Sequence, residues 1–394
     1  MSRAIASETT ETVPLALRGP LWALFVVATA YGLVLPVLPA LLGSAVPGGI
    51  AAATGALMAT YTLATVVASP VWGWLLDRYP ARRLLLIGLL SQGLVQLALW
   101  WPPSLTTLVV IRALQGALGA VAVPAVLTLA AQWCPPALYG AAVARVSRAA
   151  LLGGLAGPLL GGVLAQGASL RLPVAVATGL ILIAAVAIAR VDVTPIAASA
   201  ETVAPTADRP RLWLLAAAAM IAGMVMGAME VGISVRGREA LGLSASSIGL
   251  MFSGCGLVMI LVQTGVFRPQ RDPASLWRLL APAFLISALG LGVLRWATET
   301  WMLSAVVALV AAGGGVLLPT ISLWIVRSAG RAHGPQLGLR AALGGLGQAA
   351  GALLAGVAFR AQAPQTFWIA PVIGLAAGIA WALTRRPPGP EAAP

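Results

Sequence analysis

Residues 105–132 read LTTLVVIRALQGALGAVAVPAVLTLAAQ, an apolar stretch that carries one formal charge, Arg112. A helix of this length spans the ~30 Å hydrocarbon core of a bilayer. A guanidinium in that core costs at least ~2.5 kcal/mol, so an arginine placed there indicates a functional site with a partner to be found. The stretch therefore predicts a membrane-spanning helix with a functional charge.

The composition of the whole chain agrees with a membrane protein. Hydrophobic residues make up 60% of the 394 residues and charged residues only 9%. Soluble domains use roughly a quarter of their residues as charges, so most of this surface is expected to face lipid. The basic residues, all arginine, are dispersed at the ends of apolar runs, which argues against nucleic-acid binding despite the net charge of +13.

Eleven further apolar segments are long enough to cross a bilayer, which predicts twelve transmembrane helices and an all-α polytopic fold. We expect a cytosolic tail at 1–19, a six-helix bundle at 20–190, a cytosolic linker at 191–210, a second six-helix bundle at 211–384 and a cytosolic tail at 385–394. The first tail lacks the basic region and cleavable apolar core of a signal peptide. The expected helices lie near 20–42, 50–76, 83–101, 104–132, 140–166, 172–190, 211–235, 246–267, 275–295, 301–327, 337–358 and 365–384.

The arginines predict the orientation. With the N-terminus inside, 18 of the 24 arginines fall in cytosolic segments or helix ends, five fall on the opposite side, and Arg112 is the remaining one. Cytosolic loops are enriched in basic residues, so both termini are expected in the cytosol of a cell-membrane protein.

The two halves resemble each other, which predicts duplication. GAVAVP at 119–124 matches GGVLLP at 314–319, and RAAL at 148–151 matches RAAL at 340–343. These offsets, 195 and 192 residues, are close to half of the chain. Parallel six-helix repeats place a substrate site between them near the midplane, which predicts a transporter.

Three motifs resemble the major facilitator superfamily, specifically its twelve-helix drug:proton antiporter branch. GWLLDRYPARR at 73–83 is similar to the cytosolic gate motif G-x-x-x-D-R-x-G-R-R, with Pro80 and Ala81 departing from it. The corresponding region of the second half has Pro269 where the acid is expected. In the fourth helix, L-x-x-x-R-x-x-Q-G-x-x-G at 108–119 resembles the motif whose arginine is linked to proton transfer. The resemblance implies the major facilitator fold and covers about 20–384.

The fifth helix carries G-x-x-x-G-P-x-x-G-G-x-L at 153–164, which resembles the family's antiporter motif. Proline within a helix removes a backbone donor, and closely spaced glycines let a neighbouring helix approach. We expect a bent, tightly packed helix, and the resemblance implies export. The motif residues are Gly153, Gly157, Pro158, Gly161 and Gly162.

Proton coupling is expected at Glu230 and Arg112. Glu230 is the only acid within the expected spans apart from Asp77 at a helix end, and it lies at a depth similar to that of Arg112. Burial favours a neutral carboxyl and a nearby cation favours its charged form, so Glu230 could load and release a proton as its surroundings change. The alternative is a structural carboxyl that reaches the outer interface. The family often has an acid in the first helix, but YGLVLPVLP at 31–39 has none.

The resemblance also implies a cytosolic gate and a substrate site on the first, fourth, seventh and tenth helices. The acid at Asp77 is expected to hold the gate closed, with Arg148 and Arg340 among its candidate partners; plain membrane anchoring is the alternative for these arginines. Substrate contacts are the weaker hypothesis, because methionine and aromatic residues more often pack. The gate candidates are Gly73, Asp77, Arg78, Arg82, Arg148 and Arg340, and the substrate-binding candidates are Tyr31, Gln115, Met224, Met226, Trp324 and Gln348.

The sequence thus predicts a secondary active transporter, with proton-coupled efflux of a small lipophilic or amphiphilic compound as the leading function. A proton-coupled importer and a non-transporting assembly factor are the alternatives. One histidine and two separated cysteines offer no catalytic or metal cluster, and without lysine there is no phosphate-binding loop. We therefore expect no enzyme activity, cofactor or metal, and a monomer whose partners are a small molecule, protons and membrane lipid.

Overall fold

The computed structural model describes residues 15–38, 42, 50–101, 104–134, 136–166, 171–190, 209–267, 273–328 and 333–360, with isolated positions at 374, 377, 378 and 381. The predicted twelfth helix, the linker and both tails lie largely or wholly outside these residues. Within them, eleven stretches are long and apolar enough to cross a membrane, and they match the first eleven predicted spans.

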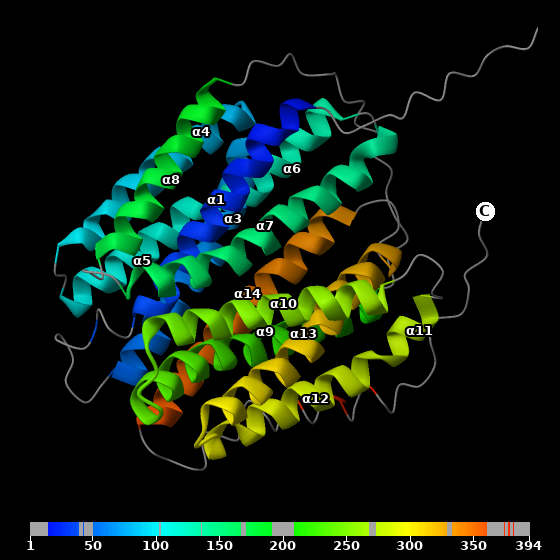
Figure 1. Cartoon of the computed structure of the whole chain (residues 1–394). Helices are drawn as coiled ribbons and strands as arrows, with labels where there is room; N and C mark the ends of the chain where they lie inside the picture. The colour runs from blue at the N-terminus through cyan, green and yellow to red at the C-terminus, as the bar shows by residue number, and fades with distance from the viewer. Residues whose placement is uncertain are drawn as a thin grey trace, which may run out of the picture.

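The first half contains α1 (Arg18–Val34), α3 (Ile50–Leu76), α4 (Ala81–Leu97), α5 (Leu105–Gly119), α6 (Ala122–Trp133), α7 (Pro136–Leu164) and α8 (Arg171–Ala189). The second half contains α9 (Arg209–Val235), α10 (Ala245–Val266), α11 (Pro273–Arg278), α12 (Leu280–Val293), α13 (Thr300–Ser328) and α14 (His333–Arg360). Figure 1 shows the helices of the first half, blue to green from α1 to α8, as one bundle and those of the second half, green to orange from α9 to α14, as another.

The fourth span differs from the single helix expected at 104–132, because a turn at Ala120 and Val121 divides it into α5 and α6. Pro124 contributes to the break, since its nitrogen cannot donate to the carbonyl of Ala120 one turn earlier. Serine side chains define where two spans begin. Ser104 accepts a hydrogen bond from the backbone N–H of Thr107 before α5, and Ser244 accepts one from Ser247 before α10.

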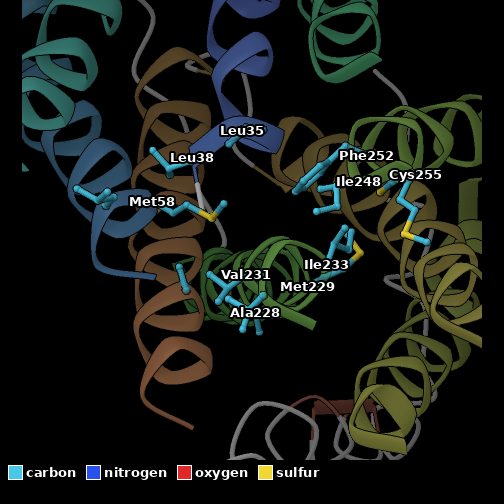
Figure 2. Packing of buried hydrophobic residues seen from close by; sticks show 14 of the residues in the cluster. Leu35, Leu38, Met58, Ala228, Met229, Val231, Ile233, Ile248, Phe252 and Cys255 are labelled. Atoms are coloured by element: carbon cyan, nitrogen blue, oxygen red, sulfur yellow. The ribbon is translucent and has the colours of Figure 1, made fainter. Parts of the chain in front are cut away.

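The hydrophobic core is shared between the bundles at one end and divided at the other. The shared core joins residues near the Ser104 end of both halves. Figure 2 shows Leu38 and Met58 of the first half in the same cluster as Val231 of α9 and Phe252 of α10. Toward the Asp77 end, each half has a core of its own, one containing Leu85 and the other Phe284. The bundles are therefore packed together at the Ser104 end.

Glycines bring helices into backbone contact within each bundle. A Cβ atom on Gly157 of α7 would lie 2.7 Å from the Cα of Gly32 on α1, and one on Gly161 would meet the backbone of Leu33. In the second bundle, Gly227 of α9 faces the backbone of Gln348 on α14 in the same way. The predicted tight packing of the fifth helix is thus present, with α1 as its neighbour.

We expect Gly157→Val to destabilise the fold, because the added side chain would overlap the backbone of α1. Overpacking costs ~1–3 kcal/mol, which would lower the melting temperature of a chain of this length by roughly 1–4 °C. Thermal melting of the purified protein measures the effect. Gly154→Val is the matched control on the same helix, since no atom lies within 4 Å of its added Cβ. Equal melting temperatures for the two variants would contradict this packing argument.

Candidate functional site

Arg112 on α5 is buried, with 1% of its surface exposed, and it forms part of a chain of polar side chains. Its Nη1 donates to Oε1 of Gln115 over 3.3 Å, one turn further along α5. The Nε2 of Gln115 in turn donates to Oε1 of Gln96 on α4. The arginine is thus held within the first bundle by two neutral amides.

Two tyrosines whose rings contact each other lie beside the guanidinium. The rings of Tyr31 on α1 and Tyr61 on α3 have centroids 4.5 Å apart. The Cζ atom of Arg112 is 5.8 Å from the Tyr31 centroid and 5.7 Å from the Tyr61 centroid. These distances permit cation–π attraction, which stabilises the positive charge without satisfying its N–H groups.

Glu230 lies on α9 in the second bundle and has a different partner. The Nε2 of Gln348 on α14 donates to Oε1 of Glu230 over 2.8 Å. The close contact between Gly227 and the backbone of Gln348 keeps α9 and α14 together one turn from the acid. The carboxyl and its amide partner therefore belong to one packed helix pair.

Arg112 and Glu230 have separate hydrogen-bond partners. No salt bridge joins Arg112 to Glu230 in the ranges that the structure describes. Each charge is instead bonded to a glutamine, Arg112 to Gln115 and Glu230 to Gln348, and the sharing of one cavity by the two residues stays a prediction.

The predicted gate residues do not form one cluster. Asp77 is exposed, and its side chain has no ion-pair or hydrogen-bond partner among the described residues. Arg78 stacks on Trp74, with 3.7 Å between its Cζ atom and the ring centroid. The remaining arginines lie apart: Arg82 donates to the carbonyls of Ile188 and Ala189, Arg340 donates to the carbonyl of Leu318, and Arg148 is exposed.

The antiporter motif contributes to the contact between the bundles as well as to the packing on α1. On the face of α7 toward α10, Gly162 meets the backbone of Ser246, and the carbonyl of Pro158 lies where a Cβ on Gly249 would be. Further along, the hydroxyl of Ser253 donates to the carbonyl of Leu155 over 2.7 Å. A second contact between the bundles joins Gly55 of α3 to the backbone of Ala352 on α14.

The six predicted substrate contacts fall in three places. Tyr31, Gln115 and Gln348 belong to the polar site described above. Met224 lies in the shared core, with Met226 packed against it. Trp324 packs in the core of the second bundle, 5.0 Å from Trp277 between ring centroids.

Sequence reasoning missed two residues of the site. Gln96 and Tyr61 are not in the quoted motifs, yet they contact Gln115 and the Tyr31 ring. A signal was present for Gln96, because a glutamine in an apolar span needs a hydrogen-bond partner. Tyr61 offered a weaker signal, as one of four tyrosines in the chain.

A polytopic helical protein with two similar bundles and buried polar residues between them belongs to the class of secondary transporters. The family model described as Major Facilitator Superfamily matches residues 21–331, and the chain belongs to this superfamily. It is accordingly a multi-pass membrane transporter and not an enzyme.

Curated relatives share moderate identity over most of the chain. Multidrug resistance protein MdtG of Enterobacter lignolyticus is 28% identical over 319 residues, which cover 77% of this chain and 76% of the relative. Multidrug resistance protein MdtG of Salmonella paratyphi A is 28% identical over 320 residues, covering 77% and 78% respectively. The solved structure of the human organic anion transporter MFSD10 (TETRAN) superposes with a TM-score of 0.71 at 18% identity, over 93% of this chain and 100% of that one. This last likeness supports the fold alone.

Proposed function

We propose that this transporter exports a small lipophilic or amphiphilic compound in exchange for protons. Its relatives named as multidrug resistance proteins support efflux, as does the antiporter motif on α7. The arginine distribution supports an orientation in the cell membrane with both termini in the cytosol. The Ser104 end is then the outer end and the Asp77 end the inner one.

The observation that carries this proposal is the division of the hydrophobic core. One core spans both bundles at the outer end, whereas each bundle has a separate core at the inner end. A transporter that works by alternating access needs such an asymmetry, because only one side may be closed around the substrate at a time. The arrangement corresponds to the inward-facing state.

Glu230 is the proposed proton carrier. It is the only acid within the spans drawn from the sequence apart from Asp77, and it is bonded to the amide of Gln348, which can donate to a carboxylate or accept from a carboxylic acid. Arg112 supplies a fixed positive charge that would favour proton release when the two residues approach. Movement of one bundle against the other would change that distance.

The inner gate is proposed to assemble in the opposite state. Asp77 has no side-chain partner among the described residues here, although Arg78 is its neighbour and Arg148 is exposed at the same end. Closing the inner end would bring Asp77 to basic residues and to a helix N-terminus, both of which stabilise a carboxylate. Arg82 has a different role in this scheme, because it caps the C-terminal carbonyls of α8.

The direction of transport is tested by accumulation of fluorescent lipophilic compounds in cells. We expect cells that express the protein to accumulate less dye than cells without it, and cells that express Glu230→Gln to match the latter at equal protein levels. Higher accumulation would indicate an importer. No change with any compound of a panel would favour the non-transporting assembly factor.

A further inference from the structure

Three buried donors at Arg112 and Gln96 have no hydrogen-bond partner in the described part of the chain. They are Nε and Nη2 of Arg112 and Nε2 of Gln96. Both side chains are almost fully buried, with exposed fractions of 1% and 3%. Leaving a buried donor without a hydrogen bond costs about 1–3 kcal/mol, and more for a charged group.

The two free nitrogens of Arg112 form one edge of the guanidinium. Nη1 is used by Gln115, whereas Nε and Nη2 lie side by side and donate in parallel. This edge is the fork that binds a carboxylate, sulfonate or phosphate through two hydrogen bonds. Its geometry therefore specifies the chemistry of the missing acceptor.

No acid of the described residues fills this role. Glu230 accepts a hydrogen bond from Gln348, and among the described residues no carboxylate forms a salt bridge with Arg112. Asp77 is exposed just after the end of α3, whereas Arg112 is buried in the middle of α5, about halfway along a helix that starts at the opposite end of the bundle. An acceptor for the fork would come from a molecule that enters the site.

We propose that Arg112 and Gln96 form an anion subsite, and that the exported compound is an amphiphile with an acidic group. The inference rests on the proposed transport function and names its substrate class. The acidic group would bind the Nε and Nη2 edge, with Gln96 as an additional donor. The rings of Tyr31 and Tyr61 and the methionines of the shared core offer polarisable apolar surface for the rest of the molecule.

This arrangement selects against cations. A cation beside Arg112 would leave the guanidinium fork unmatched and meet a like charge at low dielectric. An anion would neutralise Arg112, which leaves Glu230 free to carry the exchanged proton. Tyr31 and Tyr61, which lie beside the guanidinium, would shift when the ligand reaches it.

The test uses two xanthene dyes with the same ring system, anionic fluorescein and a cationic rhodamine ester. Their binding to the purified full-length protein in detergent is measured by fluorescence polarisation, which requires neither a gradient nor transport. We expect fluorescein to bind more tightly than the rhodamine ester. Arg112→Gln should weaken fluorescein binding about 10- to 100-fold, as expected when hydrogen bonds to a charged group are lost.

Matched variants separate the fork from net charge. Arg238→Gln removes an exposed arginine and should leave fluorescein affinity unchanged. Arg112→Lys keeps the charge without the fork and should restore only part of the affinity lost in Arg112→Gln. Gln96→Leu should weaken fluorescein binding and spare the rhodamine ester.

Two results would overturn the proposal: tighter binding of the rhodamine ester to wild type, or equal fluorescein affinity in wild type and Arg112→Gln. The comparison of the two dye affinities in the wild-type protein remains decisive even where a variant does not fold. If the dyes bind as proposed but transport in vesicles does not depend on protons, the proposed function is refuted and the anion subsite is retained. If the protein transports cations in response to a proton gradient but does not bind fluorescein, the anion subsite is refuted and the proposed function is retained.

Discussion

Replacing Glu230 with glutamine is expected to abolish accumulation of substrate against its gradient while leaving downhill exchange intact. Glutamine keeps the size of the side chain and can still bond to Gln348, but it carries no exchangeable acidic proton. A pH difference of one unit supplies 1.36 kcal/mol per proton, enough for about a tenfold concentration ratio. That ratio should fall to about one in the variant. Proteoliposomes with an imposed pH gradient give the measurement.

Glu239→Gln is the matched control for this experiment. Glu239 follows α9 by one turn, is exposed, and loses the same charge in the substitution. The Glu239→Gln variant should accumulate substrate to the wild-type ratio. If Glu230→Gln still concentrates the substrate in response to the gradient, Glu230 is not the coupling acid and its bond to Gln348 is structural.

Two glycine substitutions are expected to stop transport in opposite states. Gly249→Leu would place a side chain against the carbonyl of Pro158 and so prevent closure of the outer end. Gly73 has no atom within 4 Å of its added Cβ and lies seven residues after Val66, which packs on Gly345 of α14. Residues seven apart on a helix lie on the same face, so Gly73 faces the second bundle as Val66 does. Gly73→Leu should therefore be compatible with this structure but should block closure of the inner end.

The native Cys255 reports which state is reached. It is 6% exposed and lies in the core shared by the two bundles, toward the end proposed to be the outer one. We expect a membrane-impermeant thiol reagent added outside cells to label it faster in Gly249→Leu than in wild type, and no faster in Gly73→Leu. Transport should fall to background in both variants. Gly179→Leu on α8 is the control, because its Cβ would meet no atom within 4 Å and should preserve transport. Unchanged labelling with full transport in Gly249→Leu would contradict the outer closure.

The positions of the spans were predictable because a bilayer requires long apolar segments with internally satisfied backbones. The predicted segment at 246–267 and the observed α10, Ala245–Val266, differ by one residue at each end. The break between α5 and α6 was not predicted, since proline and glycine occur in the same pattern in α13, which remains continuous.

The partners of the buried side chains could not be predicted from the sequence. Counting residues from the helix ends placed Arg112 and Glu230 at similar depth, but the rotation of each helix decides which neighbour a side chain meets. Glu230 meets Gln348 because Gly227 allows α14 to approach closely, and Arg112 meets Gln115 on its own helix. A sequence pattern also carries no information on which end of the transporter is closed at a given moment.

The most direct test of proton-coupled export is proton movement driven by the substrate itself. Wild-type protein is reconstituted into liposomes that contain a pH-sensitive dye, with equal pH on both sides, and a substrate gradient is then imposed. Antiport predicts that the compartment receiving substrate loses protons and becomes more alkaline, and that Glu230→Gln shows no such change. Acidification of that compartment, or substrate flux without any change in pH, would contradict the account.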